Sequence, residues 1–162
     1  MPIKQLWAPW RMEFIKGEKP GECVFCAALT QKEDRKNLVL HRADKAFIIL
    51  NKYPYNNGHL MIVPNRHIAD FAQLEDEELL AIAQLSRSAV KALTEAYKPE
   101  GFNLGMNLGQ SAGAGIKDHL HLHVLPRWGG DTNFLPVIAE TKSMHQHLEG
   151  SYDQLKPWME KA

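Results

Sequence analysis

The sequence predicts an α+β fold in which an antiparallel sheet packs against one long helix. Short apolar runs with strand character recur along the chain, and two of them flank the turn-forming residues Asn56-Asn57-Gly58. One long segment, at about 76–98, instead spaces its apolar residues at the 3.6-residue period of an amphipathic helix. Strands combined with a single long central helix are typical of the α+β class with an antiparallel sheet.

Length and composition favour one domain over residues 1–162, with 44% apolar and 23% charged residues. The formal net charge is zero and the pI is near 7.1, so no basic excess indicates binding to nucleic acid or to a membrane surface. No apolar run is long enough for a signal peptide or a bilayer span, and we therefore expect a cytoplasmic protein.

The N-terminal half is expected to supply an arm, a short helix or turn, and three strands. Residues 1–20 form an N-terminal arm without a clear period, and Cys23 opens a helical or turn segment that ends near Thr30. The charged run 31–37 is expected to be a surface loop. Strands are expected at 38–40, 46–50 and 60–63, and the last two form an antiparallel hairpin with a polar tip.

The C-terminal half begins with the long helix. Asp76-Glu77-Glu78 places negative charge in its first turn, which suits the helix dipole, and Pro99 ends it. A strand is expected at about 102–108, followed by a glycine-rich loop and a strand that carries three histidines. Residues 134–162 form a C-terminal extension, with a second helix at about 144–159.

The most informative segment is Asp118-His119-Leu120-His121-Leu122-His123-Val124. Successive side chains of a strand point to opposite faces, so one face carries three imidazoles and the other carries apolar residues that pack in a core. The preceding loop, Gly109–Gly115, contains glycines whose backbone N–H groups can approach a ligand anion closely. Imidazoles beside such a loop indicate chemistry on phosphate.

This histidine pattern resembles the signature of the histidine-triad (HIT) family of nucleotide hydrolases and transferases. Further segments resemble that family in the same order along the chain, and they are Leu6–Arg11, Asn51–Pro54, Gly58–Pro64 and Pro126–Asp131. The first and last of these resemble its dinucleoside-polyphosphate branch. The resemblance covers most of the chain from Leu6 to Asn133 and implies a HIT-like fold, a five-stranded antiparallel sheet with one long central helix and a C-terminal helix. It also implies a homodimer.

The resemblance implies a role for each site residue. His121 would be the nucleophile that forms a covalent nucleotidyl-histidine intermediate at an α-phosphate, and His123 would orient the site or bind phosphate oxygens. His119 is the first histidine of the triad. Asn51 would hydrogen-bond the ribose and Leu50 would contact the base. The phosphate would be held by the side chain of Asn107 and by loop residues, for which the candidates are Gln110, Ser111, Gly113 and Gly115.

The acceptor of the transferred nucleotide stays open between water and inorganic phosphate. Many relatives carry Gln or Ser shortly before the triad, whereas this chain is one residue longer between Asn107 and His119. Asp118, immediately before the triad, resembles the diadenosine tetraphosphate phosphorylases, although a solvated carboxylate would explain it equally. The expected substrate is a dinucleoside polyphosphate, above all diadenosine tetraphosphate, cleaved by phosphorolysis. Hydrolysis of diadenosine triphosphate or of nucleoside phosphoramidates is the alternative.

A second candidate site is Cys23-x-x-Cys26, whose spacing suits two thiolate ligands of zinc. The resemblance implies that His67 and His119 complete a structural Cys2His2 zinc site. The alternative is a pair of reduced, buried cysteines with an exposed His67.

Two functions of other classes also fit the triad. The three histidines could form a zinc hydrolase site with an open water position, or the chain could be a nucleotide-binding module with little turnover. The remaining histidines are given structural roles: His59 in hairpin packing, His41 exposed at a strand end, and His145 and His147 exposed at the start of the last helix.

Overall fold

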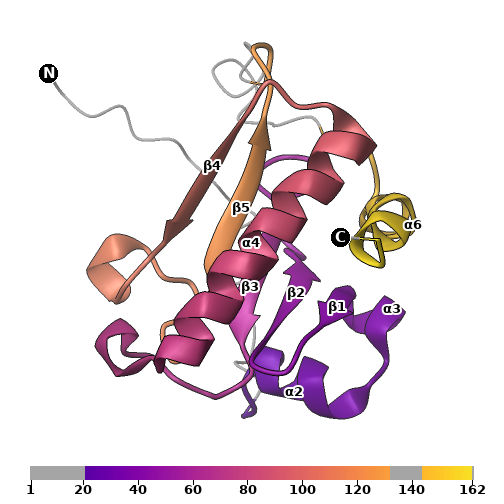
Figure 1. Ribbon diagram of the computed structural model, residues 1–162. Coiled ribbons are helices and arrows are strands. Elements are labelled where there is room, and N and C mark those ends of the chain that lie inside the picture. Colours follow the sequence, from indigo (N-terminus) through magenta and orange to yellow (C-terminus); the bar gives the residue numbers. More distant parts are fainter. Residues whose placement is uncertain (1–20, 132–143, 162) are drawn as a thin grey trace, which may run out of the picture.

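The computed structural model describes residues 21–131 and 144–161 (Figure 1). The N-terminal arm, and the part of the C-terminal extension before residue 144, lie outside the described residues. The helices are α2 (Val24–Gln31), α3 (Asp34–Asn37), α4 (Asp76–Tyr97) and α6 (Leu148–Met159), with short 3₁₀ turns at Phe71–Gln73 and Gln110–Ala112. The strands are β1 (Val39–Arg42), β2 (Ala46–Leu50), β3 (Leu60–Pro64), β4 (Gly101–Met106) and β5 (Leu122–Arg127).

The predicted α+β fold is confirmed. The five strands form one sheet in the order β1-β2-β3-β5-β4, and every neighbouring pair is antiparallel. β2 and β3 form the expected hairpin, in which Leu50 pairs with Leu60 next to the turn. Gly58 in this turn has a φ of 72°, and a Cβ at that position would lie 2.9 Å from Leu93. The turn can therefore pack directly on α4 only because residue 58 is glycine.

The two faces of the sheet carry different apolar clusters. α4 crosses one face along its whole length, with α6 beside it (Figure 1), and the large core cluster lies between this face and α4. The opposite face is partly covered by α2, and its cluster is formed by Phe25, Ala28, Val39, Phe47, Ile49, Met61 and Val63. β2 and β3 contribute to both clusters because alternate side chains of a strand point to opposite faces.

α4 agrees with its predicted bounds and its predicted acidic start. A capping box closes its N-terminus, because Glu75 and Glu78 satisfy each other's backbone N–H groups. Glu78 is buried and accepts two hydrogen bonds from Arg66, at 3.0 and 2.6 Å. This ion pair attaches the segment that follows β3 to the first turn of the helix.

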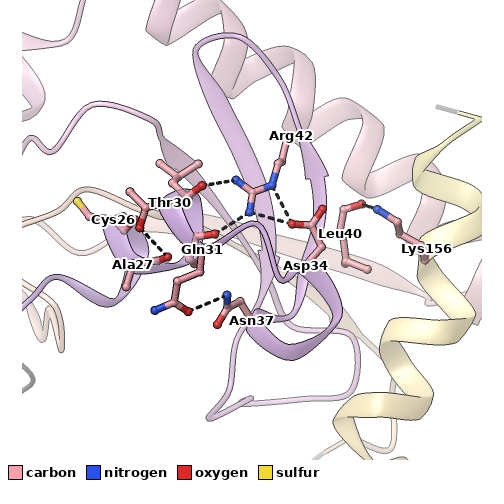
Figure 2. Close-up of polar contacts among 11 residues, drawn as sticks. Cys26, Ala27, Thr30, Gln31, Asp34, Asn37, Leu40, Arg42 and Lys156 are labelled. Carbon is pink, nitrogen blue, oxygen red and sulfur yellow. Dashed lines mark hydrogen bonds and ion pairs between the residues drawn. The ribbon is translucent and has the colours of Figure 1, made fainter.

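The predicted loop at 31–37 is wrong, since Gln31 ends α2 and Asp34–Asn37 forms the one-turn helix α3. Arg42 is the physical reason: it donates to the carbonyls of Ala28 and Leu29 and to the carboxylate of Asp34 (Figure 2). One guanidinium thereby satisfies backbone acceptors at the C-terminal end of α2 and fixes the start of α3.

Several predicted bounds are also corrected. The last helix begins at Leu148, not 144, with His147 as its N-cap residue, and β4 spans 101–106 instead of 102–108. β5 begins at Leu122, so His119 and His121 precede the strand that was expected to carry them. His41 lies within β1 and is half-buried, not exposed. Within the described residues, no helix is both long enough and apolar enough to cross a bilayer.

Candidate active site and metal cluster

The histidine segment alternates as predicted, although only its second half is regular strand. Leu120 and Val124 are buried in the cluster under α4, at 4% and 0% exposure. His119 and His121 lie on the other face, where the ring of Phe25 contacts both of them. The rings of His121 and His123 are 4.9 Å apart, edge to face.

The hydrogen bonds of His121 fix where its proton lies. Its Nδ1 is 2.9 Å from the backbone carbonyl oxygen of His119, which can only accept. Nδ1 therefore carries the hydrogen, and in the neutral ring Nε2 is left with its lone pair. The side chain is 6% exposed, so this lone pair belongs to a nitrogen largely shielded from water.

The same reasoning assigns the tautomer of His123. The backbone N–H of Tyr55 donates to Nδ1 of His59 at 3.0 Å, so the hydrogen of a neutral His59 is on Nε2. That Nε2 lies 2.9 Å from Nδ1 of His123 and donates to it. The hydrogen of His123 is then on its own Nε2, a buried nitrogen without a partner among the described residues. An N–H donor next to the His121 ring is suited to an anionic oxygen of a ligand.

Both rings are neutral at pH 7. Burial lowers the pKa of His123 to about 4, helped by the proximity of His121. Burial also lowers the pKa of His121, opposed by the hydrogen bond to the His119 carbonyl. A neutral imidazole with an available lone pair is a nucleophile, so the arrangement supports nucleophilic chemistry on an anionic substrate.

The cluster predicted from Cys23-x-x-Cys26 is assembled in the structure. One potential ligand atom from each of Cys23, Cys26, His67 and His119 lies within 4.8 Å of all the others. Sγ of Cys23 is 3.3 Å from Nδ1 of His119, and Sγ of Cys26 is 3.3 Å from Nδ1 of His67. Sulfur and nitrogen ligands of a tetrahedral zinc lie about 3.6 Å apart, so the spacing fits a metal ion.

The tautomer of His119 also suits a metal ligand. Its Nε2 donates to the carbonyl oxygen of Pro64 at 2.8 Å, which leaves the Nδ1 lone pair facing the sulfurs. His119 therefore faces the cysteines, while Nδ1 of His121 and of His123 is occupied by other partners. The three triad histidines do not converge on one point, which disfavours the three-histidine zinc hydrolase.

The loop residues predicted to bind phosphate connect β4 to the histidine segment. β4 pairs with β5 so that Gly105 is opposite His123. The pairing ends with Met106 opposite Leu122, so Asn107 and His121 are the next residues beyond the paired ends of the two strands. The following loop is exposed at Gln110, Ser111, Gly113 and Gly115, and φ of Gly113 is 86°, in the left-handed region that suits glycine.

The two hairpin residues predicted to bind the nucleoside, Asn51 and Leu50, lie in different surroundings. Asn51 is half-buried, accepts from the backbone N–H of Tyr53 at 2.9 Å, and has Nδ2 at 3.3 Å from Nδ1 of His59. Leu50 is 2% exposed in the cluster under α4, so the structure does not bring it to the face that carries the histidines. The apolar β2 side chain nearest Asn51 on that face is Ile49. Asp118 is exposed, as a solvated carboxylate would be.

Two residues of the site were not predicted as such. His59 is fully buried and hydrogen-bonded to His123, whereas the sequence indicated only hairpin packing. Its signal in the sequence was a single histidine next to the otherwise apolar strand β3. Phe25 is 1% exposed, and its centroid lies 5.4 Å from that of His119 and 5.3 Å from that of His121. An aromatic residue between two cysteines carries no such signal.

The fold and these two arrangements define a nucleotide hydrolase or nucleotidyltransferase of the histidine-triad type. A family model described as the HIT domain matches residues 31–130, and the chain belongs to this family. An AP-4-A phosphorylase from Mycobacterium tuberculosis is 37% identical over 154 residues, which cover 90% of this chain and 79% of that protein. The chain is therefore an enzyme.

Solved structures agree on the fold. A hypothetical histidine triad nucleotide-binding protein from Sulfolobus tokodaii superposes with a TM-score of 0.69 at 25% identity, covering 86% of this chain and 93% of that one. A Zn-bound histidine triad family protein from Mycobacterium smegmatis gives a TM-score of 0.70 at 24% identity, covering 86% and 94%. At that identity the second likeness concerns the fold alone.

Proposed function

We propose that the protein cleaves dinucleoside polyphosphates, above all diadenosine tetraphosphate, by phosphorolysis at an α-phosphate. The observation that carries the proposal is the hydrogen bond from Nδ1 of His121 to the His119 carbonyl, which leaves Nε2 as the nucleophilic atom. The similarity to an AP-4-A phosphorylase over 90% of the chain supports the choice of substrate and acceptor.

In the first step, the Nε2 lone pair of His121 attacks the α-phosphorus. An N–P bond forms as the bond between phosphorus and the bridging oxygen breaks, and ATP leaves. The ring becomes positively charged, and its Nδ1–H is already held by the His119 carbonyl, so no proton has to move. The Nε2–H of His123 donates a hydrogen bond to the departing oxygen, which leaves as an anion and needs no proton.

In the second step, an oxygen of inorganic phosphate attacks the phosphorus of the nucleotidyl-histidine. A P–O bond forms, the N–P bond breaks, and His121 regains its lone pair as ADP is released. Asn107 and the N–H groups of the glycine loop would bind the non-bridging oxygens, with Gln110 and Ser111 as side-chain candidates. Asn51 would bind the ribose, and Ile49 replaces Leu50 as the apolar contact of the base.

We further propose that Cys23, Cys26, His67 and His119 hold one structural zinc ion. Two thiolates and two imidazoles in a closed set of four are ligands that suit zinc, and they leave no open position for a catalytic water. The ion would fix the N-terminus of α2 against the histidine segment without taking part in bond making. His119 would thus belong to the metal site, and its backbone carbonyl to the active site.

We also propose that the protein is a single domain that acts as a cytoplasmic homodimer. β4 is an edge strand, and beside it lies an apolar groove shared with α4, lined by Leu104, Leu108, Phe71 and Leu79 among others. These four side chains are between 37% and 49% exposed. An edge strand next to an apolar groove suits a second copy, because a two-fold axis would pair β4 with β4 and cover both grooves.

Product analysis tests the proposed reaction. The purified protein is incubated with diadenosine tetraphosphate, with and without inorganic phosphate, beside the variant His121→Ala, and nucleotides are separated by anion exchange. ATP plus ADP that require phosphate support phosphorolysis, whereas AMP plus ATP without phosphate identify a hydrolase. Equal activity of wild type and His121→Ala would refute the assigned nucleophile.

A parallel incubation addresses the alternative substrate. The adenosine 5′-monophosphoramidase hnt1 of Schizosaccharomyces pombe is 31% identical over 105 residues, covering 65% of this chain and 74% of that protein. Faster turnover of adenosine 5′-monophosphoramidate than of diadenosine tetraphosphate would therefore replace the proposed substrate while keeping the proposed nucleophile.

A further inference from the structure

His121 is held by two contacts of different kinds. The hydrogen bond to the His119 carbonyl fixes one atom of the ring, Nδ1, but an imidazole attached at one atom can still tilt about that bond. The second contact is with the ring of Phe25, whose centroid is 5.3 Å from the His121 centroid with an interplanar angle of 51°. Together the two contacts define both the position and the plane of the ring.

Phe25 is itself held from several sides. It lies between Cys23 and Cys26 in the first turn of α2, and its ring also packs edge to face against His119 at 5.4 Å. At the other end of α2, Arg42 donates to the backbone carbonyls of Ala28 and Leu29 at 2.6 and 2.9 Å (Figure 2). The helix that carries Phe25 is thus fixed to the sheet at its C-terminal end and to the metal cluster at its N-terminal end.

We propose that Phe25 is a positioning residue: its ring fixes the plane of the His121 imidazole so that Nε2 faces the substrate. The proposal rests on the nucleophile assigned above. It gives the Cys23-x-Phe25-Cys26 segment a second role beside metal binding, because the residue between the two cysteines supports the reacting ring. A ring that tilts away from the line of attack loses rate even when the substrate is bound equally well.

The test compares Phe25→Leu with a matched control, Phe47→Leu. Phe47 belongs to the same apolar cluster, is 0% exposed, and has its ring centroid 6.5 Å from that of Phe25. Among the described residues its ring contacts Phe25 but neither His119 nor His121. Both variants lose the same atoms from the same cluster, so a general loosening of the cluster affects both.

Two measurements are made on the metal-loaded full-length protein. The first is kcat and KM with the substrate identified by product analysis. We expect Phe25→Leu to lower kcat by roughly 10-fold to 100-fold with little change in KM, and Phe47→Leu to retain kcat within about 3-fold. Equal losses in both variants, or a rise in KM at constant kcat in Phe25→Leu, would overturn the proposal.

The second measurement does not depend on turnover. Nitrogen-15 and carbon-13 relaxation of the histidine side chains at one fixed pH reports the mobility of the His121 ring. The wild type and Phe47→Leu should show a rigid His121 ring, whereas Phe25→Leu should show increased ring motion while the hydrogen stays on Nδ1. A His121 ring that is equally rigid in Phe25→Leu would overturn the proposal even if the wild type cleaves no nucleotide, an outcome that by itself counts only against the proposed function. Phe25→Met is the second variant if Phe25→Leu does not fold.

Discussion

The tautomer of His123 can be tested by two substitutions of His59, each of which keeps one of the hydrogen bonds that link His59 to Tyr55 and to His123. In His59→Gln the amide nitrogen reaches about as far as Nε2 and can still donate to Nδ1 of His123. In His59→Asn the shorter side chain matches Nδ1 and can still accept from the Tyr55 N–H, but nothing donates to His123. Both side chains are polar and both occupy a site that is 0% exposed in the native protein.

The expected magnitudes follow from the two bonds at 2.9 and 3.0 Å. Each variant breaks one of these two hydrogen bonds while keeping a polar side chain at the site, which costs about 0.5–1.5 kcal/mol, so the two should lose similar stability. Activity should differ, because only His59→Asn allows His123 to place its hydrogen on Nδ1 and turn a lone pair towards the leaving oxygen. We expect kcat to fall roughly 10-fold to 100-fold in His59→Asn, which corresponds to about 1.4–2.7 kcal/mol of barrier.

The assay is the nucleotide separation used for product analysis, with thermal unfolding followed in parallel. His59→Gln should retain kcat within a few-fold of wild type while its midpoint temperature falls about as much as that of His59→Asn. If the two variants lose activity equally, His59 only fills space in the hairpin and the tautomer assigned to His123 is unsupported.

Three further outcomes are expected. His67→Gln should lose bound zinc, measured by elemental analysis, and lower the midpoint temperature by roughly 5 °C, whereas the exposed His145→Gln should retain both. If the proposed dimer forms through this groove, light scattering should show a monomer for Leu104→Glu, whereas Leu80→Glu, on an α4 residue that is 58% exposed and does not line the groove, should remain dimeric. Stability should fall with acid, because unfolded His123 takes up a proton below its ordinary pKa of 6.5 and the native ring does so only near its pKa of about 4. The free energy of unfolding should therefore drop by about 2 kcal/mol between those values, after allowance for solvent screening, and a shallower drop is expected in His123→Asn, measured by urea unfolding across that range.

Local periodicity predicted the parts of the fold that depend on neighbouring residues. The alternation around His121 placed the histidines on one face, because a strand repeats every two residues whatever it pairs with. The spacing of Cys23 and Cys26 indicated a metal site for a similar reason, since one helical turn brings the two sulfurs together. These features are encoded within a few residues of each other.

The errors arose where a residue's position depends on contacts that are distant along the chain. Every residue of β2 is buried, so its apolar run does not indicate that Ile49 shares the histidine face and Leu50 does not. The contact between His59 and His123 depends on the pairing of β3 with β5, in which Met61 is opposite His123. The register between two strands that are distant in the sequence decides which residues face each other. The residues around His59 therefore do not indicate that His123 is its partner.

The late start of β5 has a consequence for the proposed chemistry. In a regular antiparallel strand the backbone carbonyls are directed towards the neighbouring strands, with which they form hydrogen bonds. Here the strand begins at Leu122, and the preceding backbone bends so that the His119 carbonyl accepts from the imidazole of His121. The bend is stabilised on both sides, by the His119 ring bonded to Pro64 and by the Leu120 N–H bonded to Ile68 at 2.7 Å. The departure from the predicted strand is therefore the feature that gives His121 its nucleophilic tautomer.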